Sequence, residues 1–254
     1  MPGEHAADID RISPTRRPAV RAIGHHRWSN LLFVHWQLPA EVVQPLLPAG
    51  LTLDTWDGTA WVGLVPFQMS GIRPWWSPAI PGISNFLETN VRTYVHFRGE
   101  GPGVWFFSLE APSSLAVRIA RWRWHLPYHR SVMDLQHNGD RLQYKCRRLW
   151  PGEQGAGCEI NVELGPAAHE NGNTATPGTL EHFLIERYLL YSQSHSGQLL
   201  RGQVHHAPYP LRTARLIDCH DSLLAAAGMP PQCEPCHAIF SPGVQVEVFP
   251  LELC

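Results

Sequence analysis

The stretch FLETNVRTYVHF, residues 86–97, alternates between two kinds of side chain, and this pattern decides the fold class. One set of alternate positions is aliphatic or β-branched and comprises Leu87, Thr89, Val91, Thr93 and Val95. The other set is polar or aromatic and comprises Phe86, Glu88, Asn90, Arg92, Tyr94 and His96. Because successive side chains of a strand point to opposite faces of a sheet, the stretch predicts a β-strand with one core face and one face of ionisable groups.

The polar face of this strand has two interpretations. In the first it is exposed to solvent, as the outer face of a half-buried strand ordinarily is. In the second it faces the inside of a barrel. Burying Glu88 and Arg92 without partners would be costly there, so the two side chains are expected to pair or to bind a ligand. The second interpretation predicts a polar cavity inside the protein.

The rest of the chain repeats short apolar runs that are separated by Gly, Pro, Asn and Asp, which is typical of an all-β sandwich or barrel. We expect strands at 31–37, 59–68, 86–97, 103–110, 130–137, 141–149, 158–164, 198–206, 211–217, 237–241 and 244–250. Helical spacing predicts short helices at 39–47, 114–125, 179–191 and 221–227. In the second of these helices, the apolar positions Leu115, Ile119 and Trp122 are separate from a basic stripe that contains Arg118 and Arg121. The fold class is therefore mainly β, with a few short helices.

The 254 residues, of which 44% are hydrophobic and 17% charged, are enough for one large β domain with a real core. Residues 1–24 carry charge and proline with little apolar pattern, so we expect a disordered or loosely ordered tail. Residues 25–254 are expected to form a single domain.

The charge pattern argues against several classes of partner. The net charge is −2 and the basic residues are scattered, so neither nucleic acid nor a membrane is an expected partner, whereas a homo-oligomer is compatible with the sequence. There is no apolar run of about 18 residues and no apolar stretch near the start, which predicts a cytoplasmic protein.

The order of motifs resembles the YqjF-like family of uncharacterised bacterial proteins, and the resemblance runs from about Trp28 to Leu251. The blocks that carry it are WSNLLFVHW (28–36), LPAGLTLD (47–54), WVGLVPF (61–67), ETNVRTYV (88–95), VWFFSLE (104–110), LPY (126–128), ERYLLY (186–191) and RGQVHHAPYPL (201–211).

That family is distantly similar to acetoacetate decarboxylase, which implies an antiparallel β-barrel or double sheet around a central cavity. In acetoacetate decarboxylase a lysine forms a Schiff base with the oxo acid, and nearby glutamate and arginine side chains help to place the carboxylate. The strand that carries Glu88 looks similar to the strand that carries the active-site glutamate of the decarboxylase.

The lysine is where this chain departs from acetoacetate decarboxylase. The stretch 113–128, where paired lysines would be expected, contains three arginines and no lysine. An arginine has no free amine to attack a carbonyl. Lys145 is the one lysine of the chain, and its polar neighbours predict a solvent-exposed position. A Schiff-base mechanism is therefore not expected.

The candidate site residues follow from the strand and from the resemblance. Glu88, Tyr128 and His129 are candidates for acid/base catalysis, since a carboxyl, a phenol and an imidazole all transfer protons. Candidate ligand-binding residues, with Arg92 paired to an anionic group, are Arg92, Asn90, Tyr94, His205 and His35. Tyr128 can equally be a packing residue with its hydroxyl bonded to the backbone, and His35 a structural histidine.

Two functions remain open. The protein could act on a small organic acid or carbonyl compound without a Schiff base, or it could bind or sense such a molecule without turnover. Neither a cofactor nor a metal site is expected. Cys233, Cys236 and His237 have the spacing of a haem-attachment motif but lie in a proline-rich loop, and adjacent His205 and His206 point to opposite faces of a strand.

Overall fold

The computed structural model describes residues 9–80, 84–152, 154–169, 173–230 and 234–254. Strands dominate it: β1 (Gly24–Leu38), β2 (Leu51–Leu53), β3 (Ala60–Pro74), β4 (Phe86–Phe97), β5 (Glu100–Ala111), β6 (Tyr128–Asn138), β7 (Arg141–Trp150), β8 (Gly157–Ala167), β9 (Leu189–Gln193), β10 (Leu199–His206), β11 (Arg212–Asp221), β12 (His237–Val248) and β13 (Glu252–Leu253). The helical elements are η1 (Ser13–Thr15), α1 (Ala40–Val43), η2 (Gln44–Leu46), α2 (Ser114–Arg123), α3 (Leu180–Ile185) and α4 (Leu223–Ala226). The mainly β prediction is confirmed.

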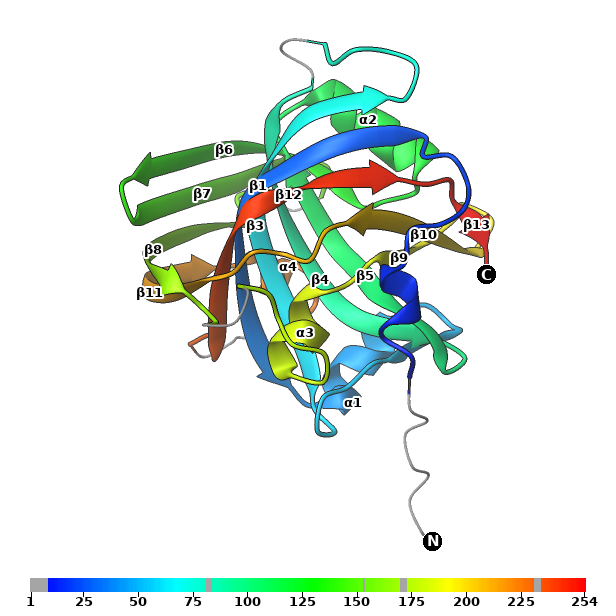
Figure 1. Ribbon diagram of the computed structural model, residues 1–254, viewed down its shortest axis with the longest axis horizontal. Coiled ribbons are helices and arrows are strands. Elements are labelled where there is room, and N and C mark those ends of the chain that lie inside the picture. The colour runs from blue at the N-terminus through cyan, green and yellow to red at the C-terminus, as the bar shows by residue number, and fades with distance from the viewer. Residues whose placement is uncertain (1–8, 81–83, 153, 170–172, 231–233) are drawn as a thin grey trace, which may run out of the picture.

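The strand pairings close into two rings that share five strands. Ring A follows the order β1–β3–β4–β5–β9–β10–β12 and back to β1, because β10 pairs with both β9 and β12. Ring B follows β1–β3–β4–β5–β6–β7–β8–β11–β12 and back to β1. Figure 1 shows β6, β7, β8 and β11 on one side of the shared strands, and β9, β10 and β13 on the other.

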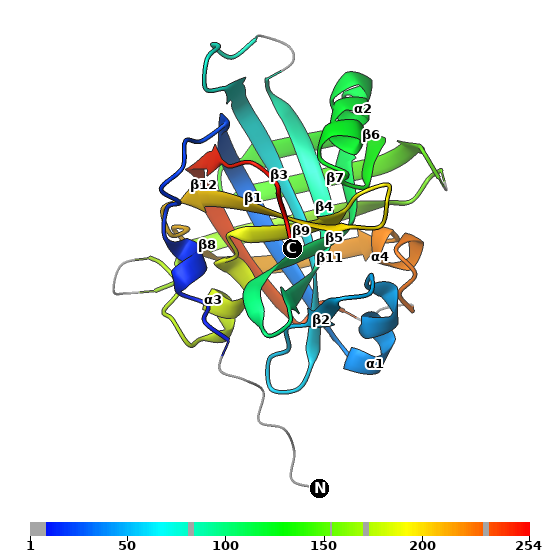
Figure 2. The same cartoon turned by 90° about the vertical axis from the view of Figure 1, so that its right-hand side faces the viewer.

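Strand β5 is where the two rings separate. Its early residues Val104 and Trp105 pair in parallel with β9, and its last residues, 109–111, pair in parallel with β6. Figure 2 shows β5 between the two sets of strands, with α2 beside β6. Because all of the shared strands have one face toward each ring, both of their faces are buried.

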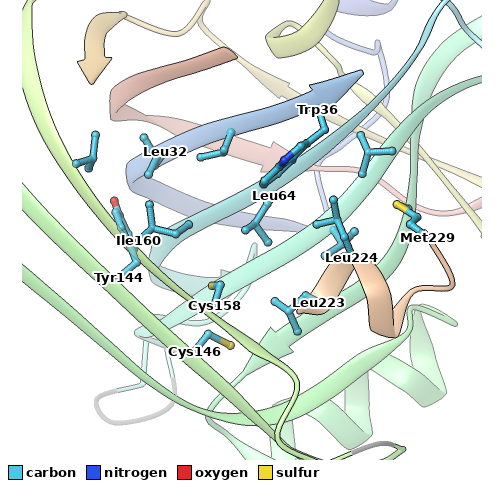
Figure 3. Packing of buried hydrophobic residues seen from close by; sticks show 14 of the residues in the cluster. Leu32, Trp36, Leu64, Tyr144, Cys146, Cys158, Ile160, Leu223, Leu224 and Met229 are labelled. Atoms are coloured by element: carbon cyan, nitrogen blue, oxygen red, sulfur yellow. The ribbon is translucent and has the colours of Figure 1, made fainter. Parts of the chain in front are cut away.

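Each ring encloses its own hydrophobic core. On β1, Leu32 and Val34 belong to the core of ring B, whereas Leu31 and Phe33 belong to the core of ring A. Figure 3 shows the ring B core, in which Leu32 and Leu64 of the shared strands meet Tyr144 and Ile160 of β7 and β8. This arrangement explains why sequence alternation on β4 does not mark a solvent-exposed face.

Most predicted strands are confirmed, although β1 begins at Gly24 and not at residue 31, and β3 ends at Pro74 and not at residue 68. The segments expected at 237–241 and 244–250 form one continuous strand, β12, because Gly243 adopts a φ of 133° beside the backbone of Trp28. The short strands β2 and β13 were not expected.

The helix expected over 179–191 is wrong in its second half. It ends at Ile185, and residues 189–193 form β9, which closes ring A. Thr179 caps the helix as its position suggests, since its hydroxyl accepts a hydrogen bond from the His182 amide.

Helix α2 forms where it is expected but packs on another side. Val117 is its buried residue, whereas Leu115, Ile119 and Trp122 are exposed, Trp122 by 73%. The helix contacts β6 and β5, but these three side chains point away from both strands into solvent. The apolar spacing therefore predicts the helix correctly but not the side of it that packs.

The N-terminal residues 9–23 lie against the strands of ring A. Arg11 pairs with Asp54, Arg17 pairs with Glu247, and the amide of Ile23 donates to the carbonyl of Val248. In the described ranges, no helix has the length and apolar character that a membrane crossing requires.

Candidate functional site

The polar face of β4 is buried and points into ring A. Glu88 is 3% exposed and Arg92 is 8% exposed, and Tyr94 on the same face belongs to the ring A core. Of the two interpretations of this face, the one that exposes it to solvent is therefore wrong. We call the inner face of ring A around these residues the candidate site.

Glu88 has a phenol as its hydrogen-bond partner. The Tyr128 hydroxyl donates to Glu88 Oε2 at 2.7 Å, so its partner is a side chain and not the backbone. Burial raises the pKa of the Glu88 carboxyl to about 7, and the hydrogen bond from Tyr128 opposes that rise only in part. A carboxyl with this pKa can either give or take a proton near neutral pH.

Arg92 does not pair with Glu88. Its Nη2 donates to the carbonyl of Leu184 at 3.0 Å, and its guanidinium carbon lies 5.4 Å from the Phe33 ring centroid and 5.7 Å from that of Tyr94. Its Nε is buried without a partner, and no carboxylate lies within 4.0 Å of it among the residues that the structure describes. Among the described residues, Arg92 is therefore a buried guanidinium that forms no ion pair.

A chain of hydrogen bonds fixes the surroundings of Arg92. The Tyr94 hydroxyl donates to the Leu184 carbonyl at 2.8 Å, so it must accept from His35 Nε2, also at 2.8 Å. The other nitrogen of His35, Nδ1, is therefore the acceptor at 3.0 Å from His237 Nδ1. Burial lowers the pKa of His35 well below its usual value, which keeps this ring neutral. His35 is thus fully hydrogen-bonded.

Gly63 allows His35 and Arg92 to approach each other across β3. A Cβ at this position would lie 3.1 Å from His35 Cδ2 and 3.5 Å from Arg92 Cγ. The register supports the same arrangement, because Gly63 pairs with His35 on one side and with Arg92 on the other.

Several further polar atoms of ring A are buried without a partner among the described residues. They include Asn90 Oδ1, Ser192 Oγ, Trp28 Nε1, Trp61 Nε1, Arg187 Nη2 and His206 Nε2. Asn90 lies two residues after Glu88 and therefore on the same inner face of β4. Ser192 lies two residues after Leu190, which packs on the ring A core, and shares its face of β9. Such groups are uncommon inside proteins and call for an explanation.

The sequence directed attention to His205, but the inward-facing imidazole is that of His206. His205 Nδ1 lies 3.2 Å from the carbonyl of Thr15, and His205 pairs in register with Glu247 on the outer face of the sheet. His206 is 3% exposed and stacks on Tyr188 with ring centroids 4.3 Å apart. The side chain of the buried Glu186 accepts from the Tyr188 hydroxyl and from the Tyr209 amide, and burial raises its pKa.

His129 and Lys145 lie away from the candidate site. His129 Nδ1 is 2.7 Å from the carbonyl of Pro151, and its register partner Glu110 forms a buried ion pair with Arg148 on the ring B side. The Lys145 side chain is 46% exposed and pairs with Glu159 at 2.8 Å. Of the cysteine motif, Cys233 lies outside the described residues, and the amide of Cys236 donates to the carbonyl of His35.

Two of the hollows at the surface of the described residues differ in their lining. One of about 300 Å³ is lined by His25, Arg73, His205, His206, Ala207, Gln245, Val246 and Glu247. The other, of about 540 Å³, lies over the ring B thiols Cys146 and Cys158. Neither contains Glu88 or Arg92, so the candidate site is defined by its buried polar groups and not by either hollow.

The arrangement of strands is similar to that of solved acetoacetate-decarboxylase-like proteins. The enduracididine biosynthesis enzyme MppR, complexed with pyruvate, aligns with a TM-score of 0.61 and 14% identity, over 92% of this chain and 91% of that one. An acetoacetate decarboxylase-like enzyme from Sphingomonas wittichii RW1 aligns with a TM-score of 0.62 and 13% identity, over 92% and 94%. Acetoacetate decarboxylase from Legionella pneumophila aligns with a TM-score of 0.56 and 12% identity, over 94% of each chain. At these identities the likeness defines the fold class, acetoacetate-decarboxylase-like.

Sequence comparison gives the family within this class. Residues 25–245 match the DUF2071 family, described as "Uncharacterized conserved protein". The protein YqjF of Bacillus subtilis (strain 168) is 34% identical over 209 residues, which are 82% of this chain and 83% of that protein. The chain belongs to the DUF2071 family.

Proposed function

We propose that the interior of ring A binds a small organic acid, with the carboxylate of the ligand beside Arg92. The observation that carries this proposal is the buried guanidinium without an acidic partner. A buried charge without a partner is costly, and the carboxylate of a bound ligand would pair with this guanidinium. The complex of MppR with pyruvate supports the same class of ligand for this fold.

Glu88 and Tyr128 extend the proposal from binding to chemistry. With its pKa raised to about 7, the Glu88 carboxyl is suited to move a proton to or from a carbon next to a carbonyl group. The exposed, ion-paired Lys145 supports a reaction without a Schiff base, since an imine requires a free amine that reaches the ligand.

The binding part of the proposal is tested by titration calorimetry with pyruvate, acetoacetate, hexanoate and octanoate against the parent protein and Arg92→Met. Methionine keeps much of the volume and removes the charge. We expect at least one acid to bind the parent, and the variant to bind it about 30-fold or more weakly. Equal affinity of parent and variant for that acid, or binding of none of the four acids, would contradict the proposal.

The chemical part is tested by the exchange of carbon-bound protons of pyruvate and acetoacetate in D₂O, followed by NMR. An enzyme that uses Glu88 exchanges these protons faster than buffer does, and Glu88→Gln removes the acceleration while leaving ligand affinity in place. If the parent binds a ligand without accelerating exchange, the alternative of a binding or sensing protein without turnover is favoured.

A further inference from the structure

The unpartnered atoms of ring A differ in the kind of hydrogen bond that they lack. The donors without an acceptor are Arg92 Nε, Trp28 Nε1, Trp61 Nε1 and Arg187 Nη2, whereas Asn90 Oδ1 is an acceptor without a donor. A ligand that offers only acceptors, such as a simple oxo acid, can satisfy donors of this kind but not the Asn90 oxygen. The unpartnered donors and acceptors therefore indicate which polar groups the ligand has besides its negative charge.

His206 is a second acceptor of this kind. Its Nδ1 lies 2.8 Å from the carbonyl of Ala207, and because a carbonyl can only accept, Nδ1 carries the proton. Burial lowers the pKa of His206 to about 4, so the ring is neutral and Nε2 presents a lone pair. Nε2 is buried and has no partner in the part of the chain that the structure describes.

Trp28 brings a donor to the same place. The rings of Trp28 and His206 have centroids 6.0 Å apart, and Trp28 Nε1 is buried without an acceptor. A single oxygen atom that lies about 2.9 Å from each of two ring nitrogens forms a hydrogen bond with both of them. An oxygen atom that both accepts from an indole N–H and donates to an imidazole nitrogen belongs to a hydroxyl group or to water, and in a ligand it is a hydroxyl. A carbonyl cannot donate, and an ammonium cannot accept.

Aromatic contacts connect this pair to Arg92. Arg92 lies over Phe33, Phe33 contacts Tyr209 with centroids 5.4 Å apart, and Tyr209 contacts His206 with centroids 4.5 Å apart. Two aromatic rings thus separate the guanidinium from the imidazole. A ligand that reaches both has its hydroxyl several carbon atoms away from its carboxylate.

We propose that the ligand of ring A is a hydroxy acid, with its carboxylate on Arg92 and a distant hydroxyl between Trp28 Nε1 and His206 Nε2. This inference rests on the proposed function, because it takes the anionic end of the ligand from there. It adds a hydroxyl subsite formed by β1 and β10, which lie on either side of β12 (Figure 1).

The test compares ligands that differ only at one carbon atom. Dissociation constants are measured by titration calorimetry for 7-hydroxyoctanoate, 7-oxooctanoate and octanoate, and for the matching 5-hydroxyhexanoate, 5-oxohexanoate and hexanoate. We expect the hydroxy acid of at least one chain length to bind about 30-fold or more tightly than its oxo and unsubstituted partners. The reason is that a site built around a hydroxyl leaves its own polar atoms unpaired when the hydroxyl is missing.

His206→Phe is the informative variant and His205→Phe is its matched control. Phenylalanine keeps the stacking on Tyr188 and removes Nε2, so the preference for the hydroxy acid is expected to disappear. The neighbouring His205 faces the opposite side of β10, and its replacement is expected to leave the preference intact. Trp28→Phe, which removes the indole N–H, is expected to reduce the preference in the same sense as His206→Phe.

The outcomes separate this inference from the proposed function. If hydroxy, oxo and unsubstituted acids bind equally and all depend on Arg92, the proposed function stands and the hydroxyl subsite is wrong, as it would be if water occupied the place. A preference for the hydroxy acid that survives His206→Phe overturns the subsite as well. If none of the six acids binds, both proposals are contradicted.

Discussion

Two buried arginines of this protein differ in whether an acid accompanies them. Arg148 pairs with Glu110 at 2.5 Å, and the Ser131 hydroxyl donates to the same carboxylate, whereas Arg92 has the Leu184 carbonyl and aromatic faces around it. In the first arrangement a carboxylate of the protein neutralises the arginine. In the second no carboxylate of the described residues does so, and for that reason the proposed function depends on Arg92.

This difference predicts that the same substitution affects stability differently at the two positions. Arg148→Met leaves the buried Glu110 without its cation, so the free energy of unfolding is expected to fall by about 3–5 kcal/mol. Arg92→Met removes an uncompensated charge, and without ligand the unfolding free energy is expected to stay within about 1 kcal/mol of the parent or to rise. Urea unfolding at pH 7 measures both. A loss for Arg92→Met as large as that for Arg148→Met would show that Arg92 has a structural partner.

Glu88 predicts how stability depends on pH. Because burial raises its pKa from 4.5 to about 7, the folded protein keeps a proton on Glu88 that the unfolded chain releases above pH 4.5. This contribution to stability is fully present below pH 4.5 and is lost as pH rises through 7. Glu88→Gln is expected to match the parent near pH 4 and to exceed its unfolding free energy by about 3 kcal/mol above pH 7.

The control for this prediction is Glu41→Gln, which alters an exposed carboxyl. Urea unfolding of parent and both variants from pH 4 to pH 8 gives the comparison. If the difference between Glu88→Gln and the parent does not change with pH, the Glu88 carboxyl is ionised in the folded protein and its assigned role in proton transfer is lost.

Some residues of the candidate site could be predicted from the sequence. Alternation on one strand placed Glu88, Asn90, Arg92 and Tyr94 on a common face, because a strand fixes that relation locally. Trp28, Ser192 and His206 were not predicted to contribute, since their relation to β4 depends on pairings between distant segments. The choice between His205 and His206 required the register of β10 with β12, which no local pattern gives.

Among the elements, β9 and α2 show why helical spacing misleads here. Leu180, Phe183 and Leu184 give a helical pattern that continues through Tyr188 and Tyr191, but β10 and β5 both pair with residues 189–193. Pairing with two strands outweighs a weak local preference. In α2 the pattern predicts a helix correctly, whereas the side that packs depends on β6, which follows it in the chain.

The packing of α2 gives a prediction of its own. Val117→Ala creates space in the buried contact and is expected to lower the unfolding free energy by about 1–3 kcal/mol. Trp122→Ser, at an exposed position that spacing alone would place in the core, is expected to change it by less than about 0.5 kcal/mol. Urea unfolding of the two variants reports both values. A larger loss for Trp122→Ser than for Val117→Ala would mean that the helix is rotated.

For the molecule as a whole, β5 is the shared strand at which the two rings separate, and Gly103 lies where β5 meets β9 of ring A. A Cβ at Gly103 would lie 2.7 Å from the Leu189 carbonyl oxygen, a backbone atom that cannot move without disturbing β9. Gly103→Ala is therefore expected to weaken the β5–β9 contact, and to expose the amides of β9 to hydrogen exchange while those of β7 and β8 stay protected.

Gly202→Ala is the matched control, because the atom nearest to its Cβ is the end of the Leu251 side chain. It is expected to leave exchange in β9 close to that of the parent. If Gly103→Ala raises exchange equally in both rings, the rings unfold as a unit and do not open separately.

The mainly β fold class and most strands could be predicted from the sequence, since turn residues and alternation are local. The closing of two rings through shared strands could not, because it depends on β5 pairing with β9 at one end and β6 at the other. That arrangement buries both faces of β4 and places its polar residues inside the protein.

A crystal structure of the protein with a saturating concentration of an acid that binds it tests the role of Arg92 most directly. We expect electron density for a carboxylate within about 3 Å of the Arg92 guanidinium, inside ring A. Density for the ligand elsewhere with none beside Arg92, or a protein carboxylate paired with Arg92, would contradict that role.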